Sequence, residues 1–95
     1  GLKGAHMARS FVKDPNAVLD YEWDWSAWLG TDTIASHTVT AATGLTVDSS
    51  TATSTAVTAW LSGGSVGASY AVTCHVVTAA GREDDRTATI TVQER

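Results

Sequence analysis

The sequence predicts an all-β sandwich of about seven short strands, and three observations carry this prediction. Hydroxyl residues dominate the composition, with 15 Thr and 9 Ser among 95 residues, and the β-branched Thr side chain favours strands. Apolar and polar residues alternate along several segments, which is the period of a half-buried strand. Glycine and polar clusters separate these segments at intervals of roughly 8–12 residues, which is typical of β-sandwiches.

The chain divides into a leader, an arm and one domain. Residues 1–7, GLKGAHM, have the composition of a cleaved expression tag with its cloning scar, so we exclude them from the fold prediction. Residues 8–17 form an N-terminal arm that contains Phe11 and the single proline. The sandwich domain is expected over residues 18–95. A domain this small buries roughly 60% of its unfolded surface, so we expect oligomerisation or assembly to help stabilise it.

The strongest strand signal lies at residues 19–27, LDYEWDWSA. Its carboxylates occupy every second position, and a helix would distribute them around its circumference, so the pattern predicts a strand. The carboxylates then face solvent, and the inward face is aromatic. The predicted inward residues are Leu19, Tyr21, Trp23, Trp25 and Ala27.

The remaining chain predicts further strands and no helix. Strands are expected at residues 33–41, 45–48, 57–62, 69–78 and 86–93. Ile34 and Val39 differ in parity, so the first of these strands either has a bulge near Ser36 and His37 or exposes one apolar side chain. The hydroxyl run at residues 49–55 is either a loop or an edge strand.

One tyrosine refines the fold class. Tyr70 follows a Gly-rich loop and begins a strand in which Val72 and Cys74 share its face. This is the placement of a tyrosine corner on the penultimate strand of an immunoglobulin-like sandwich. We therefore predict an immunoglobulin-like antiparallel β-sandwich, in which the Tyr70 hydroxyl bonds to upstream backbone near Gly67.

Reactive residues do not form a catalytic set in this pattern. Cys74 lies on the apolar parity, where burial raises the thiol pKa, and His75 points to the opposite face. The acidic residues 83–85 are expected in a turn around Gly81, neutralised by arginines on both sides. We therefore predict that the protein is not an enzyme and has no catalytic residues, metal site or cofactor.

Charge and hydropathy restrict the partners. The formal net charge is −4 and no basic stripe is present, which argues against nucleic acid. No apolar run approaches 18 residues, which argues against a membrane span. The single cysteine cannot form an internal disulfide, which is compatible with assembly in a reducing cytoplasm.

Three aromatic residues are candidates for a partner interface. Trp28 and Trp60 fall on the polar parity of their segments, and Phe11 is the large apolar residue of the arm. The two tryptophans either pack into secondary clusters or form exposed anchors for a protein, since Trp is enriched at interface hot spots. Stacking on carbohydrate is a third reading. We assign Tyr21, Trp25, Tyr70 and Cys74 to the structural signature of the fold.

Several segments together resemble a family. The chain contains LDYEWDWSAWL, DTIAS, GLTV, WLSGG and TAAGR, in this order. It resembles short phage-encoded immunoglobulin-like virion proteins, which are described as fibre-tail adaptors or minor structural proteins. Trp28 departs from the resemblance, because a polar or basic residue is expected at that position.

The resemblance implies a function. It implies a non-catalytic virion protein that joins tail, fibre or head-tail components through a sheet edge or an aromatic patch, assembled in the host bacterial cytoplasm. A capsid decoration protein is the alternative within this class. A carbohydrate-binding or host-adhesion module is the alternative from another class. Expected partners are other virion proteins, with homo-oligomerisation on assembly left open.

Overall fold

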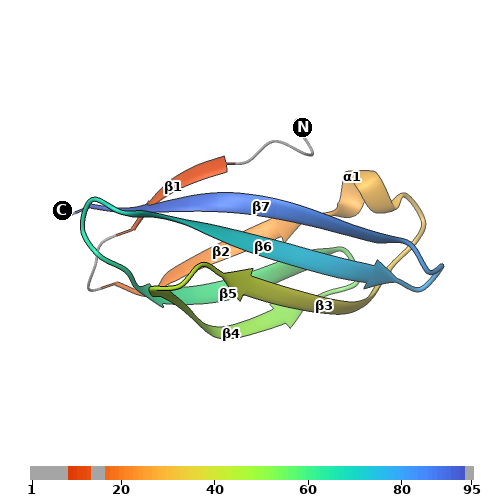
Figure 1. Cartoon of the computed structure of the whole chain (residues 1–95). Coiled ribbons are helices and arrows are strands. Elements are labelled where there is room, and N and C mark those ends of the chain that lie inside the picture. The colour runs from red at the N-terminus through yellow and green to blue at the C-terminus, as the bar shows by residue number, and fades with distance from the viewer. Residues whose placement is uncertain (1–8, 14–16, 94–95) are drawn as a thin grey trace.

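The computed structural model describes residues 9–13 and 17–93, which form two packed sheets and one helical turn (Figure 1). The strands are β1 (Arg9–Lys13), β2 (Leu19–Asp24), β3 (Ile34–Ala41), β4 (Leu45–Ala52), β5 (Ala56–Gly63), β6 (Ser69–Thr78) and β7 (Glu83–Val92), and the helix is α1 (Ser26–Leu29). One sheet has the order β1-β7-β6-β3 and the other has the order β2-β5-β4. The predicted immunoglobulin-like sandwich is confirmed.

Strand direction departs from the prediction at one pair. β1 runs parallel to β7, whereas every other pair of neighbouring strands in the described sheets is antiparallel. The reason is connectivity. The chain leaves β1 for β2 in the opposite sheet, so β1 and β7 are not consecutive and no hairpin fixes their direction.

The edge strands β3 and β4 each contain an irregularity, and only that of β3 was predicted. The pairing of β3 with β6 shifts between Ile34 and Ser36, which confirms the bulge. The hydroxyl run begins as an edge strand, because residues 49–52 complete β4. β4 contains a second shift, between Val47 and Ser49. The bulge in β3 lets both Ile34 and Val39 pack against the core although their parity differs.

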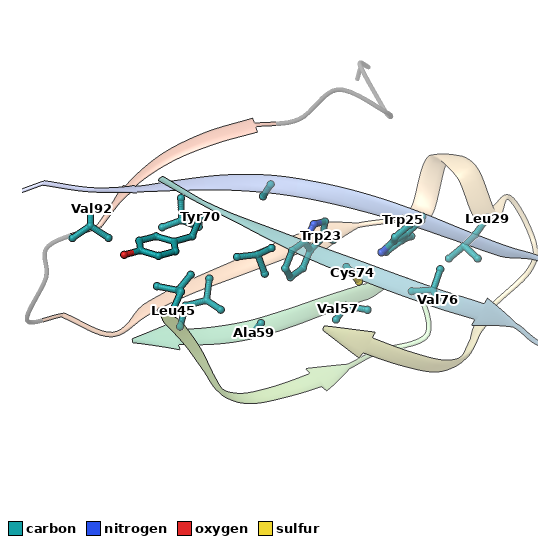
Figure 2. Packing of buried hydrophobic residues seen from close by; sticks show 14 residues of the cluster. Trp23, Trp25, Leu29, Leu45, Val57, Ala59, Tyr70, Cys74, Val76 and Val92 are labelled. Atoms are coloured by element: carbon teal, nitrogen blue, oxygen red, sulfur yellow. The ribbon is translucent and has the colours of Figure 1, made fainter. Parts of the chain in front are cut away.

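The core lies between the sheets and has Trp25 as its largest fully buried side chain (Figure 2). It draws on both sheets and on α1, and its members are Trp23, Trp25, Leu29, Leu45, Val57, Ala59, Leu61, Tyr70, Val72, Cys74, Val76, Ala88, Ile90 and Val92. Fully burying one such aliphatic side chain contributes about 1.5–3 kcal/mol. The inward side chains of β5, β6 and β7 therefore contribute most of the burial free energy that holds the two sheets together.

The predicted strand at residues 19–27 is wrong in its last part. β2 ends at Asp24, and Ser26–Leu29 form α1, although no helix was predicted. Asp24 Oδ1 accepts the Ser26 N–H at 2.9 Å, and this local bond competes with continued strand pairing. The Leu29 N–H then donates to the Trp25 carbonyl at 2.9 Å. As a result Ala27 is exposed and Leu29 is buried in its place.

The final hairpin is also tighter than predicted. Residues 83–85 belong to β7, opposite Val77, Val76 and His75, and not to the turn. Thr78 closes the turn early, because its N–H donates to the Arg82 carbonyl and its hydroxyl accepts the Arg82 N–H. Pairing therefore begins at Glu83, and the acidic side chains alternate between the two faces of the sheet.

Candidate partner-binding surfaces

One end of the sandwich is closed by stacking of Arg82 on Trp28. The Arg82 guanidinium carbon lies 4.2 Å from the ring centroid of Trp28, and Nη2 donates to the Trp28 carbonyl at 2.7 Å. Trp28 is half-buried and contacts the core, and its ring lies 5.3 Å from that of Trp25. The structure therefore places Trp28 in a packed cluster, with part of its surface left to solvent.

A second arginine, Arg86 of β7, makes the same two kinds of contact with the residues just before α1. The Arg86 guanidinium carbon lies 4.1 Å from the ring centroid of Trp25, and Nη1 donates to the Asp24 carbonyl at 2.8 Å. Burial lowers the pKa of Arg86, although nearby carboxylates oppose the shift. Sequence reasoning assigned both arginines to neutralising a turn. Arg86 lies an even number of residues before the inward Ala88 and Ile90 of the same strand, and this was the available signal.

Asp32 joins the loop after α1 to the β6–β7 turn. Its Oδ1 accepts the N–H of Thr33 at 2.9 Å and that of Ala80 at 3.2 Å, and its Oδ2 lies 3.9 Å from Arg82 Nη1. A hydrogen bond from the Thr78 hydroxyl is the main cause that lowers the pKa of Asp32. One corner of the sandwich therefore brings together residues 24–26, 32–33 and 79–82. Their contacts connect the loop after α1 to the β6–β7 turn.

The opposite end contains the tyrosine corner. The Tyr70 hydroxyl accepts the Ser65 N–H at 2.8 Å, and the ring is buried. The bonded residue is Ser65, whereas the sequence pointed to the neighbourhood of Gly67. The Gly67 N–H instead donates to the Val92 carbonyl at 2.8 Å. These bonds fix the Gly-rich loop against the end of β7.

The outer face of sheet β2-β5-β4 is acidic and contains Trp60. Trp60 lies on the central strand between Asp20 on β2 and Ser49 on β4. It alternates with the buried Ala59 and Leu61, and it is not among the residues packed on the core. The exposed carboxylates on this face include Asp20, Glu22 and Asp48, and Asp48 accepts the Ser62 hydroxyl at 2.7 Å. We call this surface the Trp60 face.

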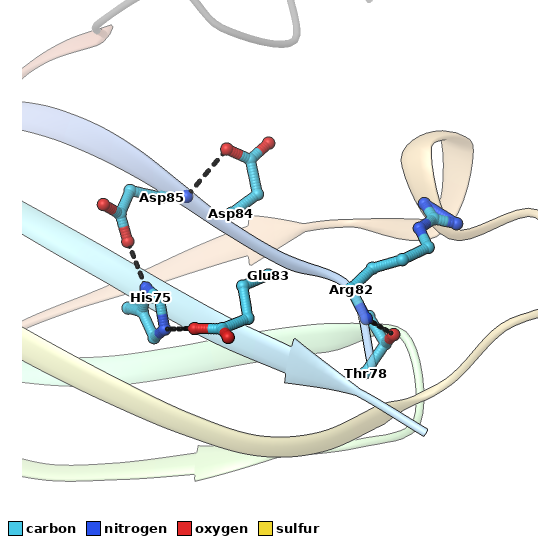
Figure 3. A network of polar contacts seen from close by, with 6 residues as sticks. All are labelled: His75, Thr78, Arg82, Glu83, Asp84 and Asp85. Carbon is cyan, nitrogen blue, oxygen red and sulfur yellow. Dashed lines mark hydrogen bonds and ion pairs between the residues drawn. The ribbon is translucent and has the colours of Figure 1, made fainter. Parts of the chain in front are cut away.

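The outer face of sheet β1-β7-β6-β3 consists mainly of hydroxyl residues. Cross-strand bonds of 2.9 Å join Thr73 to Thr87 and Ser69 to Thr91. At one end of this face His75 bonds to Asp85 through Nδ1 and to Glu83 through Nε2 (Figure 3). The hydrogen bond that the Asp85 carboxylate accepts from the ring is the main cause that raises the pKa of His75.

The remaining predicted residues lie as follows. Phe11 is in β1 opposite Ile90, and its side chain is outside the described part of the chain. Tyr21 is half-buried on the inner face of β2, with its ring 4.6 Å from that of Trp23. Cys74 is fully buried, and burial raises the pKa of its thiol to about 11. A thiol with this pKa is protonated at neutral pH and is a poor nucleophile.

Residues 9–13 and 17–93 contain no group of three or more His, Cys, Asp or Glu side chains arranged to hold a metal ion. No helix of this part of the chain is long and apolar enough to cross a membrane.

Comparison of the sequence with known families gives a match over residues 13–91 to the family described as "Podophage GP4 fiber-tail adaptor protein gp77". The chain belongs to this family. It is therefore placed among phage tail structural proteins, as a component of the virion. The adaptor family and the fold are both of non-catalytic types.

Among solved structures, the chain is similar to the "Solution structure of the PKD domain from KIAA 1837 protein". The identity is 16%, the TM-score is 0.51, and the match covers 96% of this chain and 84% of the other. This likeness shows only that the two chains have a similar fold. No curated protein matches the sequence.

Proposed function

We propose that this adaptor joins tail, fibre or head-tail components by protein–protein contacts without catalysing a reaction, and that the Trp60 face binds one of these partners. The observation that carries the proposal is the position of Trp60. Its ring stands on the outer face of the central strand and is not part of the core. Trp60 is half-buried, so part of its ring is left to solvent, and tryptophan is the type of residue that anchors an interface.

The surroundings of Trp60 suit a partner that supplies lysine or arginine. Asp20 lies directly opposite Trp60, and Glu22 and Asp48 lie on the same face. Interfaces commonly combine a central aromatic anchor with a polar rim, and rim charges steer association. Binding at this face should therefore weaken as the salt concentration rises.

The two faces of the sandwich support a joining role. The Trp60 face is acidic, whereas the hydroxyl face presents its carboxylates Glu83 and Asp85 paired with His75. The outer faces of sheets β2-β5-β4 and β1-β7-β6-β3 are on opposite sides of the sandwich and differ in chemistry, so two partners can bind at once. Phe11 and Trp28 stay predicted contacts, Phe11 along the edge strand β1 and Trp28 through the exposed part of its ring.

The proposal is tested by measuring binding of the purified protein to the tail and fibre proteins encoded by the same phage. Trp60→Ala should weaken binding to one of them by about 30-fold or more, since an anchor contributes at least about 2 kcal/mol. Val66→Ala is the matched control, because Val66 is an exposed apolar residue on a loop away from this face.

Two outcomes would contradict the proposal. One is unchanged binding of Trp60→Ala to every tail and fibre protein that the wild type binds. The other is absence of the protein from purified virions by mass spectrometry, which would contradict the adaptor role itself.

A further inference from the structure

Contacts between arginine and tryptophan recur in this chain. Arg82 covers Trp28 and Arg86 covers Trp25, with the guanidinium carbons 4.2 and 4.1 Å from the ring centroids. Each guanidinium group also donates a hydrogen bond to a backbone oxygen, at 2.7 Å from Arg82 and 2.8 Å from Arg86. A planar guanidinium group can stack on a ring and bond to an oxygen at its edge, whereas an ammonium group has no plane to stack. A tryptophan with an acceptor oxygen beside it therefore favours arginine.

Trp60 has no such cover within residues 17–93. No aromatic ring and no arginine of this range lies against its ring. The two arginines of the range are those that cover Trp25 and Trp28, and the range contains no lysine. Trp60 is half-buried but is not packed on the core, so its neighbours on the outer face of the sheet cover it in part. The rest of the ring is open to a cation from another protein.

The two carboxylates of β2 next to Trp60 also lack a partner. Asp20 is directly opposite Trp60 in the pairing of β2 with β5, and Glu22 lies two residues further along β2 on the same face. Both side chains are exposed, and neither makes a hydrogen bond or ion pair with a residue of 17–93. The other carboxylates of this range accept hydrogen bonds, and they belong to Asp24, Asp32, Asp48, Glu83, Asp84 and Asp85.

Asp20 and Trp60 are close enough to hold one guanidinium group together. Directly opposite residues of an antiparallel pair have Cβ atoms about 4.5–5.5 Å apart, and a diagonal neighbour such as Glu22 lies at about 7–8 Å. A cation is attracted to the face of a tryptophan within about 6 Å of the ring centroid. An arginine stacked on Trp60 therefore has the Asp20 carboxylate within reach of its N–H groups, and Glu22 adds attraction from further away.

We propose that the Trp60 face binds an exposed arginine of its partner protein, which stacks on the Trp60 ring and donates hydrogen bonds to the Asp20 carboxylate. This inference rests on the proposed function of the Trp60 face and names the group that this face selects. Arginine is favoured over lysine, because a guanidinium group is more weakly hydrated than an ammonium group and matches a carboxylate with two N–H groups. The arginine comes from another protein, since both arginines of residues 17–93 already cover other rings.

The test is a titration of the whole chain with tripeptides, followed by NMR of the amide and indole N–H signals. The peptides have acetylated and amidated ends and carry arginine, lysine or citrulline between two glycines. Citrulline has nearly the shape of arginine but no charge. The arginine peptide should shift the Trp60 indole signal and should bind about fivefold or more tightly than the citrulline peptide. The inference is overturned if citrulline binds as tightly as arginine, or if lysine binds more tightly.

Two variants locate the bound arginine. Asp20→Asn should lower the affinity for the arginine peptide about threefold or more. Trp60→Leu keeps an apolar side chain but removes the ring, and it should lower this affinity about fivefold or more, read from the amide signals of β2. Asp85→Asn is the matched control, because it removes the same charge from an exposed position of the opposite sheet. Equal effects of Asp20→Asn and Asp85→Asn would mean attraction by net charge alone and would overturn the inference.

The inference and the proposed function fail in different ways. If Trp60→Ala leaves binding to every tail and fibre protein unchanged, the proposed function fails. If Trp60→Ala weakens the binding of one of these proteins but Asp20→Asn has no more effect than Asp85→Asn, only the arginine inference fails. The expected result is that Asp20→Asn weakens this binding about fivefold or more, and that replacing one arginine of the partner by lysine does the same.

Discussion

Gly64 follows β5 in the Gly-rich loop, where the backbone and the packing both require the absence of a side chain. Its φ is +93°, a region that L-residues rarely adopt. A Cβ at this position would lie 2.6 Å from Val92 Cγ2 and 3.2 Å from Tyr70 Cε2. Both neighbours are buried in the core, so neither can move aside without disturbing other contacts.

We predict that Gly64→Ala lowers the free energy of unfolding by about 2–5 kcal/mol. The left-handed backbone accounts for roughly 1–2 kcal/mol of this loss, and the overlap with Val92 and Tyr70 accounts for about 1–3 kcal/mol. For a domain of this size, each kcal/mol of lost stability lowers the melting temperature by about 4–8 °C. A loss of about 2–5 kcal/mol is a large part of the total free energy of unfolding of a small domain.

Gly67→Ala separates the two contributions. Gly67 has a φ of +86° in the same loop, but nothing lies within 4 Å of a Cβ built there. The effect of alanine on the unfolded chain is the same in both variants and cancels in the difference. Urea denaturation of both variants, followed by tryptophan fluorescence, therefore measures the overlap directly. Equal losses of stability in the two variants would refute the packing argument.

Three further outcomes follow from the structure. Tyr70→Phe should cost about 1–3 kcal/mol of unfolding free energy, because the Ser65 N–H loses its acceptor, and a loss below about 0.5 kcal/mol by denaturation would contradict the tyrosine corner. Arg86→Ala should cost more stability than Arg86→Met, which keeps apolar cover over the Trp25 ring; the reverse order would contradict this role. The pKa of His75 is raised in the folded state, so its contribution to stability is complete below about pH 6.5 and is lost as the pH rises through the folded pKa. His75→Gln should abolish this decrease between pH 6 and 9 in urea titrations, and an unchanged pH profile would contradict it.

Much of the fold could be predicted because its period is local. The alternation along residues 69–78 and 86–93 assigned the faces of β6 and β7 correctly, including Cys74 inward and His75 outward. The different parity of Ile34 and Val39 indicated either a bulge near Ser36 or an exposed side chain, and the structure has the bulge. Such patterns depend on the pleat of a single strand, which is a property of neighbouring residues.

The prediction failed where a tertiary contact outweighed the period. The alternation through Trp25 and Ala27 suggested one long strand, but burial of Leu29 and the bond from Ser26 to Asp24 turn the chain into α1. The arginine stacks at this corner join residues more than 50 positions apart. No local pattern encodes such a pairing.

The sequence by itself determined the all-β sandwich, the buried thiol and the resemblance that the family match later confirmed. Alternation, turn residues and composition were sufficient for these, because they act over a few neighbouring residues. The tertiary structure decided which of the unusual tryptophans is committed to packing. Trp28 and Trp60 have the same parity signal, and only the position of Arg82 and the central place of β5 distinguish a packed ring from one outside the core.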